Sequence, residues 1–345
     1  MERIIQAEEL VKNLDQYIII DLRSPLEYQK GKIKSAINIP LFNDQIRAMI
    51  GTLYKQDKAK AYQEGYAIGT DVLPLIEAAI AKYNQKICFY CARGGSRSNA
   101  VFKSLLVKGY DVYKLHGGYK QYRNYILTTM DEYLQTLDFL VLSGNTGSGK
   151  TILLNKLYNL GYPVIDLEKL ANHRGSLFGS LGQGDQPNQR DFEDALFYEL
   201  KQYIDTGVKQ VLIESESRKV GDIYLPTLLV NKIKTNHHLL VSLPVAKRSQ
   251  IILEMYDANH LDPVELKTIV GNYCFVKRLG YEWVKRMHTL IDQHQYLLLV
   301  ENLLNDYYDL LYANSQDKYQ YQKVLEANEL DDILYQIIEY LNQKQ

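Results

Sequence analysis

The sequence contains few cysteines and prolines, one tryptophan and almost no net charge. Three cysteines among 345 residues cannot build a disulfide scaffold, which favours a reducing compartment such as the cytoplasm. No apolar stretch reaches the roughly 20 residues that a membrane helix needs, so we expect no membrane association. Polar residues follow Met1–Ile5 in place of the apolar core of a signal peptide. The net charge of −1 argues against a uniformly basic nucleic-acid-binding protein.

The small net charge hides an uneven distribution along the chain. Residues 1–137 carry 19 Lys or Arg and 14 Asp or Glu, and residues 138–288 carry 18 basic and 17 acidic side chains. Residues 289–345 carry only 3 basic but 10 acidic side chains. A nucleic-acid partner is therefore compatible with the first 288 residues, and we expect the acidic tail to lie away from it.

The length and the apolar pattern predict two α/β domains. In the first domain, the predicted elements are strands at 17–21, 86–90 and 111–115 and helices at 99–107 and 119–137. In the second, they are strands at 139–142, 164–166, 211–214 and 239–243, and an almost wholly helical pattern from Ala246 onward. We place the domains at 1–137 and 138–345 and expect a parallel sheet in the first.

A glycine-rich segment with a cysteine at its head joins a predicted strand to a predicted helix. Its informative residues are Cys91, Arg93, Gly94, Gly95 and Arg97. The glycines allow a tight curl in which backbone N–H groups point inward, and the helix N-terminus and two arginines favour anions. This setting favours a reactive thiolate that holds an anionic persulfide, perselenide or phosphate. The alternative is a small core cysteine beside a glycine turn.

Two chemistries use such a loop. One is transfer of sulfur or selenium carried on Cys91. The other is phosphate-ester hydrolysis, because a cysteine six positions before an arginine is also a phosphatase pattern, although Tyr90 stands where a phosphatase usually has histidine. Cys88 is expected to be buried, since no second cysteine pair completes a zinc site. We expect the same of Cys274, less firmly because basic residues are close by.

A second loop matches the phosphate-binding pattern Gly-x-x-x-x-Gly-Lys-Ser/Thr in every position. It consists of Gly144, Asn145, Thr146, Gly147, Ser148, Gly149, Lys150 and Thr151. An apolar strand precedes it and an apolar helix follows, which is the context that the motif requires. We expect its N–H groups and Lys150 to bind a diphosphate, with Thr151 available for Mg²⁺. Asp166 and Glu214 end strands and are candidate metal ligands or bases, or alternatively helix-capping or surface residues.

The first domain resembles the rhodanese family. Asp21-Leu22-Arg23 is similar to its Asp-x-Arg element, residues 31–40 to its Gly-His-Ile-x-Gly-Ala-x-Asn-Ile-Pro signature, and Gly117-Gly118 to a later turn. Lys32 and Ser35 depart from the signature. The resemblance implies a rhodanese fold with Cys91 as the carrier. We expect Asp21 and Arg23 to form an internal ion pair rather than to act in catalysis.

Both domains together resemble the tRNA 2-selenouridine synthase family. The similar segments are His-Arg-Gly-Ser-Leu-Phe-Gly at 173–179, Gln-Pro-Asn-Gln at 186–189 with Phe-Glu at 192–193, Glu-Ser-Glu-Ser-Arg-Lys-Val-Gly at 214–221 and Tyr-Tyr-Asp at 307–309. Leu310 replaces the proline that usually follows the last of them. Each motif is weak alone, but their order and spacing are specific. The implied fold is a rhodanese-like domain followed by a P-loop NTPase-like domain with a helical C-terminal part.

The resemblance implies a tRNA-modifying transferase without a permanent cofactor. Such enzymes act on 2-thiouridine at the wobble position, geranylate it with geranyl diphosphate and then introduce selenium from selenophosphate. Cys91 would be essential for selenation, and Lys150 and Thr151 would bind a diphosphate. We hypothesise that this diphosphate belongs to geranyl diphosphate rather than to ATP, with Mg²⁺ as a possible aid. Glu216, Arg174 and Arg218 are further candidates for the diphosphate site. The two arginines would clamp phosphate groups, or alternatively form structural salt bridges.

Basic residues in the helical region are candidates for binding tRNA. These are Lys277, Arg278, Lys285 and Arg286, which would share a face of one helix and interleave with aromatic residues. The alternative is a solvated amphipathic helix with its aromatic residues in the core. His173, His237 and His238 show no metal-ligand spacing, and no resident metal is predicted. Competing functions are a rhodanese-type sulfurtransferase or cysteine phosphatase fused to a nucleotide-dependent kinase, and a non-catalytic ligand-binding module.

Overall fold

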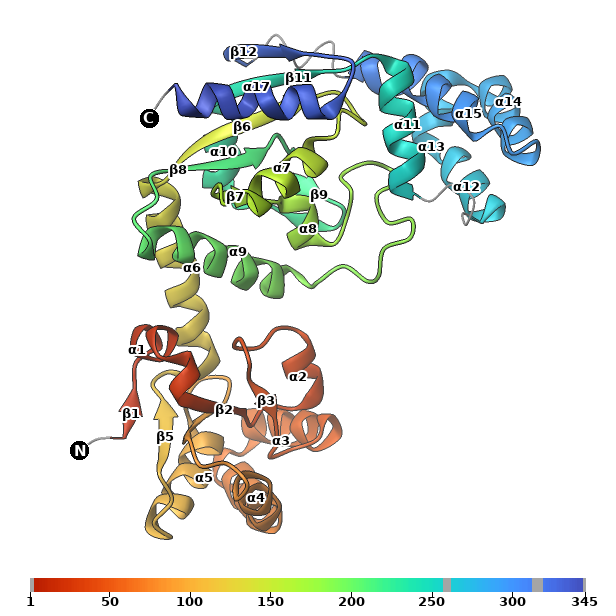
Figure 1. Ribbon diagram of the computed structural model, residues 1–345. Coiled ribbons are helices and arrows are strands. Elements are labelled where there is room, and N and C mark those ends of the chain that lie inside the picture. The colour runs from red at the N-terminus through yellow and green to blue at the C-terminus, as the bar shows by residue number, and fades with distance from the viewer. Residues whose placement is uncertain (1–2, 257–261, 312–318, 344–345) are drawn as a thin grey trace. The chain divides into compact units, whose positions relative to one another are not determined.

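A computed structural model describes residues 3–256, 262–311 and 319–343 (Figure 1). The chain divides into two compact units, one made of Met1–Asp131 with Asn188–Phe197 and the other of Glu132–Pro187 with Tyr198–Gln345. Both are α/β units, as predicted, and the parallel sheet expected in the first is confirmed. The sheet of the second unit is also parallel. In the described ranges, no helix combines the length and apolarity that a membrane span requires.

The first unit contains a five-stranded sheet with the order β1-β5-β4-β2-β3. Its elements are β1 (Ile4–Ile5), α1 (Ala7–Lys12), η1 (Leu14–Gln16), β2 (Tyr17–Asp21), α2 (Pro25–Gln29), β3 (Ile37–Asn38), α3 (Asp44–Gln56), α4 (Lys58–Ile80), β4 (Lys86–Tyr90), α5 (Ser96–Val107), β5 (Val112–Leu115) and the start of α6 (Gly118–Thr136). Central strands β2 and β4 are apolar almost throughout because helices cover both faces of a parallel sheet. The strands and helices predicted here are confirmed.

The second unit contains a five-stranded sheet with the order β12-β11-β6-β8-β7. Its elements are β6 (Asp138–Gly144), α7 (Lys150–Asn159), β7 (Val164–Ile165), α8 (Leu167–Ala171), α9 (Gln189–Asp205, whose first half belongs to the first unit), β8 (Gln210–Glu214), β9 (Lys219–Val220), β10 (Ile223–Tyr224), α10 (Thr227–Thr235), β11 (His237–Ser242), α11 (Val245–Tyr256), α12 (Pro263–Val270), α13 (Tyr273–Leu279), α14 (Tyr281–Asp292), α15 (Tyr296–Leu303), the π-helix η3 (Leu304–Tyr308), β12 (Tyr321–Glu326) and α17 (Leu330–Asn342). Figure 1 shows helices α11–α15 together beside this sheet.

Two expectations for the C-terminal region are wrong. Strand β12 interrupts the region expected to be almost wholly helical, and it pairs in parallel with β11 at the sheet edge. Only Leu325 of this strand is buried, so its sequence carries little of a buried strand's apolar pattern. The basic residues also do not share one helix, because Gly280 adopts a φ of 83° and separates α13 from α14.

Candidate active sites

The cysteine loop begins at the carboxyl end of β4 and ends at the N-terminus of α5. Cys91 is buried, and its Sγ lies 3.2 Å from the Ser98 Oγ. The Cys91 carbonyl accepts a hydrogen bond of 2.9 Å from the N–H of Tyr119. The loop therefore packs backbone to backbone against the turn before α6, where a Cβ on Gly118 would lie 2.2 Å from the same carbonyl oxygen. This close approach explains the glycine pair at the turn.

The two arginines of the loop have different surroundings. Arg93 is exposed, whereas Arg97 donates to both carboxylate oxygens of Glu27 at 2.7 and 3.3 Å. Burial raises the pKa of Glu27, but the hydrogen bond and charge of Arg97 outweigh it and lower the pKa to about 2. The charge of Arg97 is thus matched inside the protein. Gly94 packs against the backbone of Gly117 and Gly118, where a Cβ would lie 2.9 Å from either nitrogen, whereas a Cβ on Gly95 would meet nothing within 4 Å.

We expect the Glu27–Arg97 pair to stabilise the protein near neutral pH and to lose this effect in acid. A carboxyl group whose folded-state pKa is depressed stabilises above its ordinary value of 4.5, and the stability declines as pH falls towards 2. Thermal unfolding followed by circular dichroism should show that Glu27→Gln melts at a lower temperature than wild type at pH 7. The corresponding loss in the free energy of unfolding is on the order of 2 kcal/mol. The difference should shrink by pH 3. Glu8→Gln, which removes an exposed pair with Lys12, is the control. An equal difference at both pH values would contradict this account.

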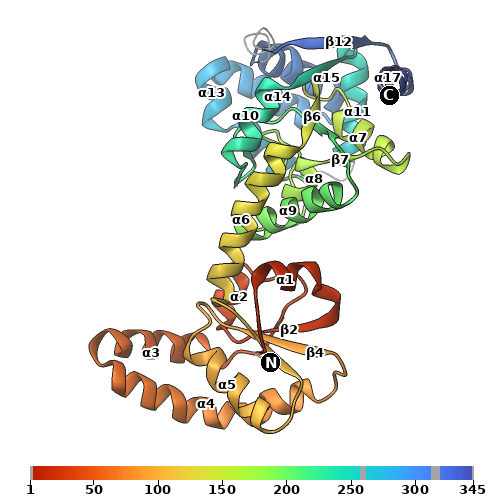
Figure 2. The same ribbon diagram turned by 90° about the vertical axis from the view of Figure 1, so that its left-hand side faces the viewer.

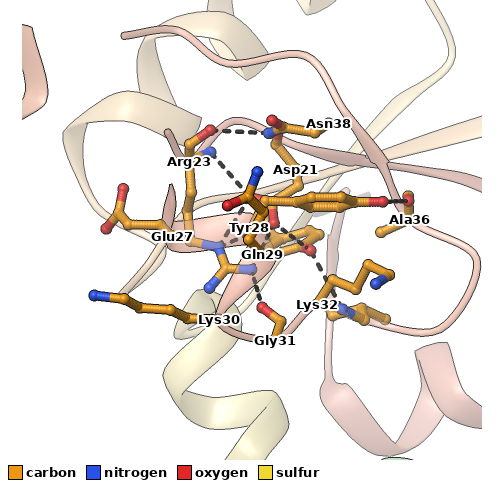
Figure 3. A network of polar contacts seen from close by, with 12 residues as sticks. Asp21, Arg23, Glu27, Tyr28, Gln29, Lys30, Gly31, Lys32, Ala36 and Asn38 are labelled. Atoms are coloured by element: carbon orange, nitrogen blue, oxygen red, sulfur yellow. Dashed lines mark hydrogen bonds and ion pairs between the residues drawn. The ribbon is translucent and has the colours of Figure 1, made fainter. Parts of the chain in front are cut away.

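Asp21 and Arg23 form the internal ion pair that the sequence predicts (Figure 3). Both are buried, and the shortest bond runs 2.6 Å from the guanidinium to the carboxylate. The guanidinium also donates to the Gly31 carbonyl at 2.7 Å, and Tyr90 donates its hydroxyl to Asp21 at 2.6 Å. Every charge in the network has a partner, which supports a structural role. It holds the rhodanese-like signature segment against the strand that leads to Cys91.

The phosphate loop joins β6 to α7. Gly149 precedes the helix with a φ of 76°, which favours glycine, and the following N–H groups face the loop. The Lys150 ammonium donates to the Gly144 carbonyl at 3.0 Å, so its side chain folds back over the loop. A Cβ on Gly147 would lie 2.6 Å from Ile252 of α11. Close packing against α11 therefore fixes the conformation of this loop.

A cavity of about 830 Å³ opens at this loop. Gly144, Thr146 and the following loop residues line one part, together with His173, Arg174 and Glu216. Apolar side chains from α12, α15 and η3 line another part, among them Leu266, Leu299, Val300, Leu303, Leu304 and Tyr307. One cavity therefore combines the glycine-rich loop with an apolar wall.

Four carboxylates approach the loop from α8 and the carboxyl end of β8. Asp166 caps α8, and burial raises its pKa to about 6. Burial and then Asp166 and Glu168 raise the pKa of Glu214 well above its ordinary value. Burial and then Glu168 raise the pKa of Glu216 to about 7. The sequence did not single out Glu168, whose carboxylate accepts a 2.7 Å hydrogen bond from the hydroxyl of Thr151.

The two candidate phosphate clamps are placed differently. Arg174 lines the cavity, donates to the Leu181 carbonyl at 2.7 Å and lies 4.6 Å from the ring of Tyr256. Arg218 is exposed and is absent from the cavity lining within the described ranges. His173 accepts a 3.1 Å bond from the Gly175 N–H, and burial lowers its pKa. The structure therefore brings Arg174, and not Arg218, to the phosphate loop.

An ion pair between a buried arginine and a half-buried aspartate, which the sequence did not indicate, braces the same loop. Arg248 of α11 donates to both oxygens of Asp309, at 2.9 and 2.6 Å, and to the Thr146 carbonyl at 3.1 Å. Asn145 donates to Asp309 at 3.1 Å. Because Asp309 directly follows η3, this pair connects the phosphate loop to the apolar wall of the cavity.

Both units match models of known families. Residues 137–345 match the tRNA 2-selenouridine synthase AAA domain, and residues 6–125 match the rhodanese-like domain. The chain belongs to the tRNA 2-selenouridine synthase family. The two matched domains lie in one chain, as the sequence motifs indicated.

Relatives in this family align over most of the chain. The tRNA 2-selenouridine synthase of Sulfurovum sp. (strain NBC37-1) is 35% identical over 85% of this chain and 87% of its own. That of Nitrosomonas europaea is 36% identical over 69% of this chain and 63% of its own. The solved N-terminal domain of a Clostridium difficile 630 protein is 40% identical, with a TM-score of 0.34, over 36% of this chain and 98% of its own.

The basic residues of this family member lie on two helices. Lys277 and Arg278 are exposed on α13, and Lys285 and Arg286 are exposed on α14. Arg286 donates to Asp306 at 3.1 Å. The neighbouring aromatic rings divide into two groups: Phe275 is buried against Trp283, while Tyr273 and Tyr281 are exposed. This region therefore combines an exposed surface of basic and tyrosine side chains with a buried aromatic core.

The other two cysteines differ sharply from each other. Cys88 is fully buried in β4, and burial raises the pKa of its thiol far above its ordinary value. The expectation of a buried Cys88 is therefore confirmed. The expectation for Cys274 is wrong, because it is exposed in the first turn of α13, where Asn272 caps the helix.

Proposed function

We propose that this protein converts wobble 2-thiouridine of tRNA into 2-selenouridine through a geranylated intermediate. The observation that carries the proposal is the cavity of the second unit, in which a phosphate loop and an apolar wall share one space. Geranyl diphosphate has a charged diphosphate and a ten-carbon apolar chain, and this cavity suits both. The names of the Sulfurovum and Nitrosomonas relatives support the tRNA product.

Geranyl transfer would take place at the phosphate loop. The sulfur of 2-thiouridine bonds to the allylic carbon, the carbon–oxygen bond to diphosphate breaks, and the proton on N3 of the base passes to solvent. Lys150 and the loop N–H groups stabilise the charge that grows on the departing diphosphate. Thr151 and Glu168 are the residues that would hold Mg²⁺, which adds further stabilisation of that charge when bound.

Selenation would take place at the Cys91 loop. The Cys91 thiol gives up its proton and its sulfur bonds to C2 of the base, while the bond from C2 to the geranylthio sulfur breaks and the departing geranylthiolate takes up a proton. Selenium of selenophosphate then bonds to C2, and the bond from C2 to Cys91 breaks to restore the free cysteine. Water then cleaves the phosphorus–selenium bond and releases phosphate, so the sequence needs no external oxidant or reductant. The open space beside Gly95 and the exposed Arg93 suit the anionic phosphate of this reagent. Three free cysteines, two of them buried, are compatible with work in a reducing cytoplasm.

Mass spectrometry of nucleosides tests the proposal directly. A tRNA that carries 2-thiouridine is incubated with the protein and geranyl diphosphate, with or without selenophosphate. We expect the geranylated nucleoside without selenophosphate and the selenated one with it. Formation of neither product would refute the proposal. A separate binding assay that finds tight ATP binding and no geranyl diphosphate binding would refute the assignment of the cavity.

A further inference from the structure

A second cavity, of about 240 Å³, lies in the first unit. Helices α3 and α4, which lie side by side in Figure 2, form much of it together with α5. Ser96 and Arg97 line it, and these are the first residues of the helix that follows the Cys91 loop. The cavity is therefore next to the loop assigned to selenation.

Two glycines one helical turn apart make this space. Gly65 and Gly69 lie on the same face of α4. A Cβ on Gly65 would meet Phe42 at 3.4 Å, and one on Gly69 would meet Leu41 at 3.6 Å. These are ordinary contact distances, so the helix would accept larger residues and they would occupy the hollow. The glycines keep open a space that a helix of ordinary composition would fill.

The lining favours an uncharged apolar ligand. Among the described residues that line the cavity, Arg97 is the one charged side chain, and Glu27 matches its charge at 2.7 Å. The side chains of Leu73 and Val101 form part of the wall. An anion would have to compete with Glu27 for Arg97, whereas an apolar chain needs no such exchange.

Three tyrosines line the cavity while remaining open to solvent. Tyr54, Tyr62 and Tyr66 are 43%, 52% and 71% exposed. The Lys58 ammonium lies 5.8 Å from the centre of the Tyr54 ring. Exposed aromatic rings beside a lysine suit unstacked RNA bases and the phosphates that join them. An apolar hollow with such a rim fits a nucleotide that carries an apolar substituent.

We propose that this cavity binds the isoprenyl group attached to the 2-thio sulfur of tRNA during selenation. The inference rests on the proposed function, because that group exists only after geranyl transfer. Selenation brings the modified base to the Cys91 loop and carries the ten-carbon chain with it. Burying the chain in the adjacent cavity removes apolar surface from water and so strengthens binding of the modified base at this loop. Such binding would make selenation select geranylated over plain 2-thiouridine.

Binding and kinetics with an anticodon stem-loop carrying S-geranyl-2-thiouridine test this inference. We expect Gly69→Leu, which fills the cavity, to raise KM for selenation about tenfold with little change in kcat, and to leave geranyl transfer unchanged. Ala67→Leu, on the exposed side of the same helix, should behave as wild type. Gly65→Leu provides a second filled cavity, and circular dichroism shows which variants keep the fold.

The S-methyl stem-loop separates this inference from the proposed function. Wild type should bind the geranylated stem-loop about tenfold more tightly than the methylated one, and Gly69→Leu should bind both equally. An unchanged preference in folded Gly69→Leu and Gly65→Leu would overturn the inference even if selenation proceeds. Wild type that binds the geranylated stem-loop but forms no selenated product would instead count against the proposed function.

Discussion

Replacing Lys150 by alanine should reduce geranyl transfer by about 10²- to 10³-fold, in the range found when one preorganised donor to a developing negative charge is removed. The Lys150 ammonium lies over the phosphate loop, 3.0 Å from the Gly144 carbonyl, where it would meet the departing diphosphate. Selenation of tRNA that is already geranylated should keep its wild-type rate, because that step uses the Cys91 loop. Mass spectrometry of each step, started from its own substrate, provides both rates.

Lys156→Ala is the matched control for this experiment. Lys156 lies on the same helix, is partly exposed and pairs with Asp331 at 2.5 Å, and it is not among the residues that line the cavity. It should retain geranyl transfer. If Lys150→Ala transferred geranyl groups as fast as this control, the phosphate loop would not be the site of geranyl diphosphate. If it lost both steps while remaining folded, the two loops would not have separate tasks.

The two loops were predictable because each is a continuous segment. The strand before Lys150, the glycines and the helix after it follow one another in the chain, and the same holds for Cys91. Arg248 and Asp309 were not predictable in this way, because they are distant in sequence and meet only when η3 packs beside the phosphate loop. Glu168 was missed for a related reason: a lone acidic residue in the first turn of α8 looks like an ordinary helix-terminal charge.

The surroundings of the loops also depend on packing that one sequence does not reveal. Arg97 was predicted to face an anion beside Cys91, yet its guanidinium is bonded to Glu27 of α2. Strand β12 was missed because a half-exposed edge strand leaves only a weak apolar pattern. The break at Gly280 was missed because a single-residue turn does the same. The cavity next to Cys91 likewise arises where α3, α4 and α5 meet, so its glycines carry no signal until the helices are assembled.

Cys91→Ser should abolish selenation, with a loss of at least about 10³-fold, and should spare geranyl transfer. A serine hydroxyl is close in size to the thiol and preserves a partner for Ser98, which now lies 3.2 Å from the Cys91 Sγ. It does not ionise near neutral pH, however, so the loop would lose its nucleophile but keep its shape. Incubation with geranyl diphosphate and selenophosphate should therefore accumulate geranylated tRNA, which mass spectrometry detects directly.

The remaining cysteines provide the controls that make this result specific. Cys274→Ser changes an exposed thiol on α13 and should leave both steps intact. Cys88 is fully buried in β4, and burial raises the pKa of its thiol, so it is not accessible as a replacement nucleophile. Selenation by Cys91→Ser at the wild-type rate would show that the loop acts by binding the anion alone. Loss of geranyl transfer as well, in a variant with wild-type circular dichroism, would contradict the separation of the two reactions between the two loops.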